Sequence, residues 1–233
     1  DSPVCVTGLS GIHKAQLVYA LTENERISLI VSDSEAAARK ICDDINMMAD
    51  KQIAFFYPSK EFVFTSMEGV SREYEHIRLE TLSNVIKGNC KVISASIEAV
   101  MQMTVPKNVL EENILEINSE KEFDIQQISR KLVSMGYVKS EKTEGVSQFS
   151  VRGSIFDIFP VGSQQPVRIE LWGDEIDSIN YFDAETQRRT ESIEKFFVAP
   201  ALETIFDRNV LTEKIKQLQN SLTKSRHNDK VSG

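Results

Sequence analysis

The first half of the chain alternates short apolar runs with segments of helical periodicity. The apolar runs predict strands at residues 4–7, 27–31, 52–57 and 91–94. Helical spacing predicts helices at residues 13–21, 34–48, 74–86 and 97–103. The hydroxyl of Ser34 is suited to cap the second of these helices. Strands separated by helices imply right-handed crossovers, so this pattern predicts a parallel, doubly wound sheet.

The pattern changes near Leu115, after Pro106 and an acidic stretch at residues 111–116. Helical spacing predicts one helix at residues 124–135, ended by Gly136, and hairpin-connected strands follow up to about Pro200. The predicted fold class is therefore α/β, with a parallel-sheet domain followed by a smaller α+β domain of antiparallel strands. We expect domains at residues 1–115 and 116–200, and the truncated start of a further helical segment at 201–233.

Two predicted strands of the second domain have one apolar and one polar face, because successive side chains of a strand point to opposite sides. The apolar faces carry Phe149, Val151, Val167, Ile169 and Leu171. The opposite faces carry Ser150, Arg152, Ser154, Arg168, Glu170 and Trp172. Two arginines and the only tryptophan of the chain among polar residues are typical of a binding hot spot.

Charge and hydropathy favour a protein partner over DNA or a membrane. The 233 residues carry a net charge of −8, with 41% hydrophobic and 27% charged residues. No segment is a basic block, so the long-range field opposes DNA. No apolar run is long enough to span a bilayer, and no export signal begins the chain. We expect a cytoplasmic, monomeric fragment of a longer protein.

The cysteine and histidine pattern does not indicate a metal site. Cys5, Cys42 and Cys90 are odd in number and far apart, which favours buried free thiols in a reducing compartment. The three histidines, His13, His76 and His227, are isolated from one another in the sequence. We therefore expect no catalytic and no metal-binding residues.

A degenerate phosphate-binding loop follows the first predicted strand. Of the working pattern G-x-x-x-x-G-K-[ST], Gly8 and Lys14 fit, and Gly11 lies inside the loop. His13 stands where a glycine lets backbone N–H groups approach the phosphates, and Ala15 replaces the hydroxyl that holds Mg²⁺. The loop predicts no competent ATP hydrolysis. It is then a retained strand–turn–helix with a solvated Lys14, or a residual anion site at the helix N-terminus.

Two motifs of the second domain carry a resemblance to a known family. F-S-V-R-G-x-I-x-D-I-F-P begins at Phe149, and P-V-R-I-E-L-W-G-D-E-I-D begins at Pro166. Together they resemble the UvrA-binding domain shared by the excision-repair helicase UvrB and the transcription-repair coupling factors. The ending F-D-A-E-T-Q-R from Phe182 is closer to the coupling factors. The similarity is strongest over residues 149–188, weaker around 8–14 and 75–102, and weakest after Ala201.

The resemblance implies an N-terminal coupling-factor module, helicase-like in fold but without a working ATPase. UvrB-like proteins also carry an aromatic-rich hairpin that clamps DNA, and the corresponding stretch here, residues 55–75, is short. Core packing near a sheet edge accounts for most of its aromatic residues, Phe55, Phe56, Tyr57, Phe62 and Phe64. In the family, ATP and Mg²⁺, RNA polymerase and DNA belong to regions absent from this chain. No cofactor is expected for the fragment.

The resemblance also implies a set of UvrA-contacting residues. Arg152, Arg168 and Trp172 match family positions that contact UvrA, and Lys139 matches a basic position of the helicase. Phenylalanine is usual where Trp172 stands, and Ser150 replaces a further arginine of the helicase.

The residues leave simpler interpretations of these positions open. In one, Arg168 pairs across the strands with Glu170 or Asp157. In another, the first domain covers Trp172. Gly153 and Asp157 are interpreted as structural, Gly153 as a bulge or close-approach site and Asp157 as a hydrogen-bonding residue.

The leading functional prediction is a non-catalytic adaptor. It would bind UvrA and so recruit nucleotide excision repair to a stalled RNA polymerase. The alternative is a fragment of an ATP-dependent DNA-repair helicase of the UvrB type, which predicts nucleotide binding at the loop. A third hypothesis is a DNA-binding module, which predicts a steep salt dependence of duplex binding.

Overall fold

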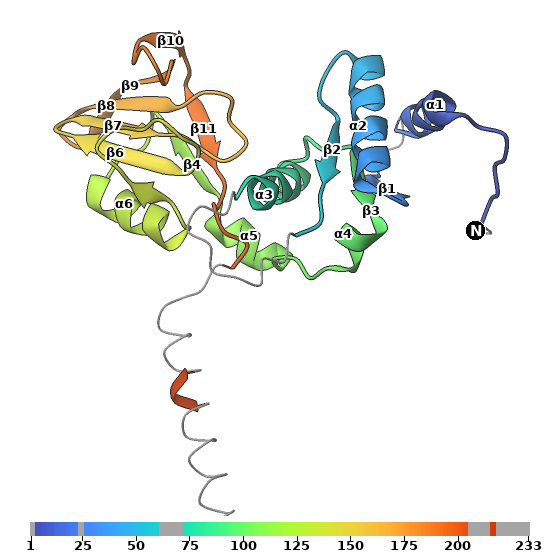
Figure 1. The fold of residues 1–233 in the computed structure, drawn as a ribbon. Helices are drawn as coiled ribbons and strands as arrows, with labels where there is room; N and C mark the ends of the chain where they lie inside the picture. Colours follow the sequence, from blue (N-terminus) through green and yellow to red (C-terminus); the bar gives the residue numbers. More distant parts are fainter. Residues whose placement is uncertain (1–2, 23–25, 61–71, 205–214, 218–233) are drawn as a thin grey trace, which may run out of the picture.

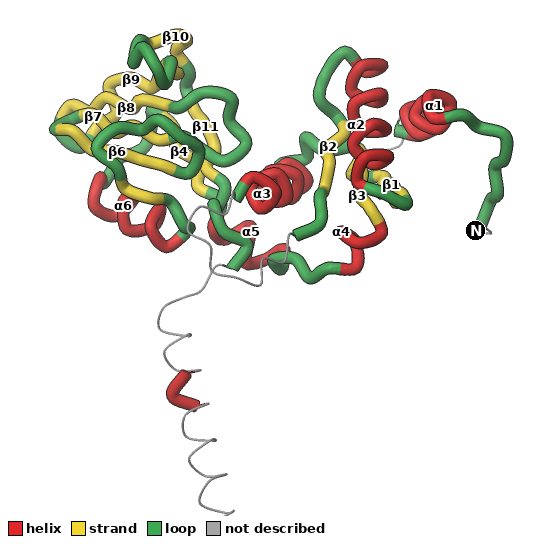
Figure 2. The backbone as a smooth tube through the Cα atoms, viewed as in Figure 1, coloured by secondary structure: helices red, strands yellow, loops and turns green. Residues whose placement is uncertain are grey.

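The computed structural model describes residues 3–22, 26–60, 72–204 and 215–217. Figure 1 shows a small parallel sheet in one part of the molecule and a larger, mostly antiparallel sheet in the other, with α3 and α5 between them. Figure 2 gives the same view by element type. The chain is thus a mixed α/β protein with parallel and antiparallel sheets, as the sequence predicts at this level.

The elements around the parallel sheet occupy the first half of the chain. They are α1 (Gly11–Leu21), β1 (Ser28–Ser32), α2 (Glu35–Ala49), β2 (Ala54–Tyr57), α3 (Glu73–Ile86), β3 (Val92–Ser96), α4 (Ile97–Met101) and α5 (Lys107–Asn113).

The parallel sheet has the strand order β1-β3-β2 and is covered on both faces. Helix α2 lies on the face that carries Ser94, whose hydroxyl donates to the Ala38 carbonyl at 2.7 Å. Leu82 of α3 packs on the opposite face, against Tyr57. Ser34 caps α2 as predicted, its Oγ accepting from the Ala37 N–H. The predicted alternation of strands and helices is confirmed from β1 onward.

The strand predicted at residues 4–7 is wrong. Residues 3–7 have no regular structure, and Val4 is 86% exposed. Helix α1 packs mainly on α2, so the segment that leads into α1 lies away from the sheet (Figure 1). An apolar run this short becomes a strand only where a sheet edge supplies its hydrogen bonds. The prediction that Cys5 is buried fails for the same reason, whereas Cys42 and Cys90 are buried as expected.

The elements of the second half are β4 (Leu115–Asn118), α6 (Ile125–Ser134), β5 (Val138–Lys139), β6 (Gln148–Arg152), β7 (Ile155–Ile158), β8 (Val167–Trp172), β9 (Glu175–Phe182), β10 (Arg189–Ser192) and β11 (Lys195–Val198). The six-stranded sheet has the order β10-β9-β8-β7-β6-β5, and only the β5–β6 pair is parallel. Strands β4 and β11 form a separate antiparallel pair.

Helix α6 packs on the apolar face of the six-stranded sheet. Asp124 caps the helix, its Oδ1 accepting from two backbone N–H groups of the first turn. The helix ends before Gly136, which has φ +93°, and a Cβ there would meet the Leu202 side chain at 2.4 Å. Glycine is needed at this position because of both the left-handed backbone and the close approach. The helix predicted at residues 124–135 is confirmed.

Residues 199–203, here called the strap, connect the two parts of the molecule. On one side the Tyr137 hydroxyl donates to the Ala199 carbonyl at 2.8 Å, and the Ala201 N–H donates to the Met135 carbonyl at 2.8 Å. On the other side the buried Glu203 carboxylate pairs with the fully buried Arg78 of α3. The strap therefore fixes α3 to the antiparallel part. Most of the helical segment predicted at residues 201–233 lies outside the described residues.

Candidate partner-binding surface

The face of the six-stranded sheet opposite α6, here called the polar face, gathers the residues that the sequence singles out. The strand register places Ser150, Asp157, Arg168 and Asn180 in one row across β6 to β9. The next row contains Arg152, Ile155, Glu170 and Ser178. Val167, Ile169 and Leu171 are buried on the other side. The predicted alternation of β8 is confirmed.

Asp157 lies at the centre of the polar face and is fully buried. Its carboxylate accepts from Arg168 at 2.7 Å (Nε to Oδ1) and 2.9 Å (Nη2 to Oδ2). Arg152 donates from Nη2 to the same Oδ2 at 2.7 Å. One carboxylate therefore holds both arginines. Of the interpretations left open by the sequence, the Arg168–Asp157 pair is the one that the structure contains.

The two guanidinium groups differ in exposure. The Arg168 side chain is 11% exposed, whereas that of Arg152 is 43% exposed. Arg168 also donates to the backbone carbonyl and the side-chain Oε1 of Gln187, and its Cζ lies 4.5 Å from the centre of the Phe182 ring. Hydrogen bonding to Asp157 raises the pKa of Arg168 above its ordinary value. Arg168 is thus embedded in the sheet surface.

Trp172 is 83% exposed at the end of β8, where Gly173 turns the chain into β9. The first part of the molecule does not cover the indole. Two strand spacings across and two residues along the sheet separate Trp172 from Arg152, about 12 Å between Cα atoms. Glu170, in the row of Arg152 and two residues before Trp172 on β8, pairs with Arg189 of β10. An exposed aromatic group and a half-exposed cation at this separation fit one protein interface.

The remaining predicted contact residues lie near the β5 edge of the same sheet. Lys139 is exposed on β5, beside Phe149 of β6. Ser150 is buried, and its Oγ lies 3.1 Å from the Thr143 hydroxyl. Since Thr143 covers this position, Ser150 offers no contact to a partner. No sequence pattern indicates that Thr143 covers Ser150, because the two residues meet only when the turn at residues 140–147 folds back onto β6.

The degenerate nucleotide loop lies in the other part of the molecule. Gly8, with φ +81°, precedes α1, and Gly11 begins the helix. His13 and Lys14 are exposed in its first turn, and the His13 Nδ1 lies 3.0 Å from the Ser10 hydroxyl. Ala15, at the position of the Mg²⁺-binding hydroxyl, is fully buried. The predicted loop followed by a helix is present, but the predicted strand before the loop is not.

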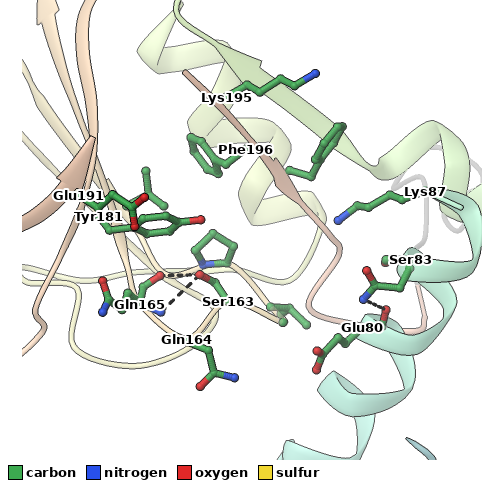
Figure 3. A pocket seen from close by; sticks show the side chains of 16 residues that line it. Glu80, Ser83, Lys87, Ser163, Gln164, Gln165, Tyr181, Glu191, Lys195 and Phe196 are labelled. Atoms are coloured by element: carbon green, nitrogen blue, oxygen red, sulfur yellow. Dashed lines mark hydrogen bonds between the residues drawn. The ribbon is translucent and has the colours of Figure 1, made fainter. Parts of the chain in front are cut away.

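A groove of about 520 Å³ lies between α3 and the 160–165 loop. Figure 3 shows Lys87 and Glu80 of α3 facing Ser163, Gln164 and Tyr181 across it. Burial lowers the pKa of Lys87 and raises that of Glu80. With Glu191 and Lys195 the lining carries two acids and two bases, so it has no net preference for an anion or a cation. None of the predicted partner-binding or nucleotide-loop residues lines it.

The structure gives no sign of a metal site or a membrane span in its described part. Within the described ranges, no group of three His, Cys, Asp or Glu side chains is arranged to hold a metal ion. Likewise, no described helix is long and apolar enough to cross a bilayer.

The antiparallel part of the chain matches a known family model. Residues 115–203, which contain α6, the six-stranded sheet and the β4–β11 pair, match the family model of the UvrB interaction domain. The chain as a whole is similar to transcription-repair coupling factors. It is 29% identical to that of Bacillus subtilis over 201 residues, which are 86% of this chain and 17% of the relative.

Two staphylococcal relatives extend the similarity over almost the whole chain. The Staphylococcus aureus (strain MRSA252) factor is 28% identical and a Staphylococcus epidermidis factor (strain ATCC 12228) is 29% identical, each over 224 residues. These residues are 95% of this chain and 19% of each relative, so the chain spans less than a fifth of their length. The comparisons confirm the resemblance inferred from the sequence motifs.

Proposed function

We propose that this chain is the UvrA-docking module of a transcription-repair coupling factor. The observation that carries the proposal is the exposed Trp172 on the same sheet face as the half-exposed Arg152, both inside the segment that matches the UvrB interaction domain. Tryptophan buries a large area at little rotamer cost, and arginine makes directional bonds to carboxylates. Docking would bring excision repair to an RNA polymerase held by other regions of the full-length protein.

The parallel-sheet part is proposed to be a helicase-like domain with a degenerate nucleotide loop. Its order of strands and helices supports this assignment, and Ala15 removes the hydroxyl that Mg²⁺ needs. The residues of the loop do not fit ATP and Mg²⁺, so the fragment acts as an adaptor and not as an enzyme. ATP-driven translocation and contacts with DNA would belong to other regions of the full-length protein. A UvrB-type helicase would instead bind labelled ATP at the loop.

Titration calorimetry with purified UvrA tests the docking proposal. We expect the fragment to bind, and Trp172→Ala and Arg152→Ala each to weaken binding by about 2 kcal/mol, roughly 30-fold in Kd. Met47→Ala is the matched control, because Met47 is 80% exposed on α2, far from the polar face in sequence and fold. Absence of binding by the unmodified fragment, or full affinity of both variants, would refute the proposal.

A further inference from the structure

The two arginines of the polar face differ in the donors that they retain for a partner. An arginine side chain has five N–H donors. Arg168 uses four of them within the protein, two on Asp157 and two on Gln187. Arg152 uses one, on Asp157. A bidentate bond to a partner carboxylate needs two free donors on one guanidinium group, and of these two arginines Arg152 is the one whose described contacts leave them.

Asp157 is placed to act as a fixed anchor. It lies on β7 between β6 and β8, directly opposite Arg168, and its backbone carbonyl accepts from the Thr143 hydroxyl at 3.3 Å. Arg152 sits opposite Ile155 and reaches Asp157 along the diagonal of the sheet. The anchor thus holds one Nη of Arg152 and leaves the rest of its guanidinium group towards solvent.

The charges of Arg152, Asp157 and Arg168, here called the arginine cluster, also favour Arg152 as the residue that meets a partner. Arg152 and Asp157 alone would form a neutral pair with little attraction for an anionic partner group. Arg168 adds a second positive charge on the same carboxylate, so the cluster as a whole keeps one unit of positive charge. Because Arg168 is almost buried and Arg152 is half-exposed, the excess charge is presented at Arg152.

We propose that Asp157 and Arg168 are positioning residues that hold Arg152 towards UvrA, and that UvrA contributes a carboxylate opposite Arg152. This inference rests on the proposed docking function. Fixing a long side chain before binding removes part of the ordering cost of the interface. Arg168, matched by resemblance to a contacting position, then acts through Arg152 and not by its own contact.

A double-mutant cycle measured by UvrA affinity tests the proposal. We expect Asp157→Asn and Arg168→Lys to weaken binding of the unmodified chain by roughly tenfold. In an Arg152→Ala background neither change should weaken binding further, because Asp157 and Arg168 act on the partner through the Arg152 side chain, which is then absent. A further loss of more than about threefold in that background would overturn the inference. Arg168→Lys keeps the positive charge but loses the paired Nε and Nη2 donors that bind Asp157. This variant therefore tests the proposal even if Asp157→Asn does not fold.

A second measurement separates this inference from the docking proposal. In the isolated fragment, ¹⁵N relaxation of the Arg152 Nε–H reports the mobility of that side chain. We expect Asp157→Asn or Arg168→Lys to increase this mobility. Unchanged mobility in a folded variant would overturn the anchoring role whether or not UvrA binds. An unmodified fragment that fails to bind UvrA would instead refute the proposed function.

Discussion

The ion cluster that ties the strap to α3 gives the sharpest stability prediction. Arg78 is fully buried and pairs with Glu203, whose side chain is 3% exposed. Arg78 also donates to the Pro58 carbonyl at 2.7 Å, and Lys60 lies 2.6 Å from the other Glu203 oxygen. Glu203→Ala leaves a buried guanidinium without its counter-charge. Removing one partner of a buried pair costs about 3–5 kcal/mol, so we expect a loss of that size in the free energy of unfolding.

Urea unfolding followed by circular dichroism measures this loss. The exposed pair of Lys107 and Glu111 on α5 is the control, and Glu111→Ala should change the free energy by less than about 0.5 kcal/mol. Replacing both buried charges, in Arg78→Met with Glu203→Leu, should recover much of the loss, because no buried charge then remains unpaired. If Glu203→Ala cost no more than the α5 control, the proposed role of the cluster in joining the two parts would be refuted.

Two further predictions concern titratable groups. Burial lowers the pKa of His76 below its unfolded value, so on acidification the unfolded chain takes up the proton first. The contribution of His76 to the free energy of unfolding is then complete above the unfolded pKa, near 6.5, and is lost below it by at most about 1.4 kcal/mol per pH unit. His76→Gln should remove this pH dependence of stability in urea titrations. The same pH dependence in the variant and the unmodified chain would contradict the prediction. Burial also raises the pKa of Cys42 to about 12 and of Cys90 to about 11. Only the exposed Cys5 should react quickly with a thiol reagent in the native state, and all three in urea; fast reaction of a second thiol would count against the buried assignment.

Local sequence signals predict most elements of the fold. Residues 167–171 alternate strictly between apolar and polar, and the strand β8 places them on two faces as that pattern requires. The cap at Ser34 and the helix stop at Gly136 are likewise local signals, and each is found where the sequence predicts it. Periodicity and capping depend on neighbours a few residues away, which the sequence contains in full.

Which groups remain available for a partner depends on the folded structure as a whole. The apolar run at residues 4–7 has strand composition, but no sheet edge pairs with it, so it is not a strand. Arg152 and Arg168 look equivalent in the sequence, yet Asp157 and Gln187 consume the donors of Arg168 and leave those of Arg152. Glu203 meets Arg78 across 125 positions of the chain. Strand pairing, donor use and burial depend on residues distant in sequence, which only the folded chain brings together.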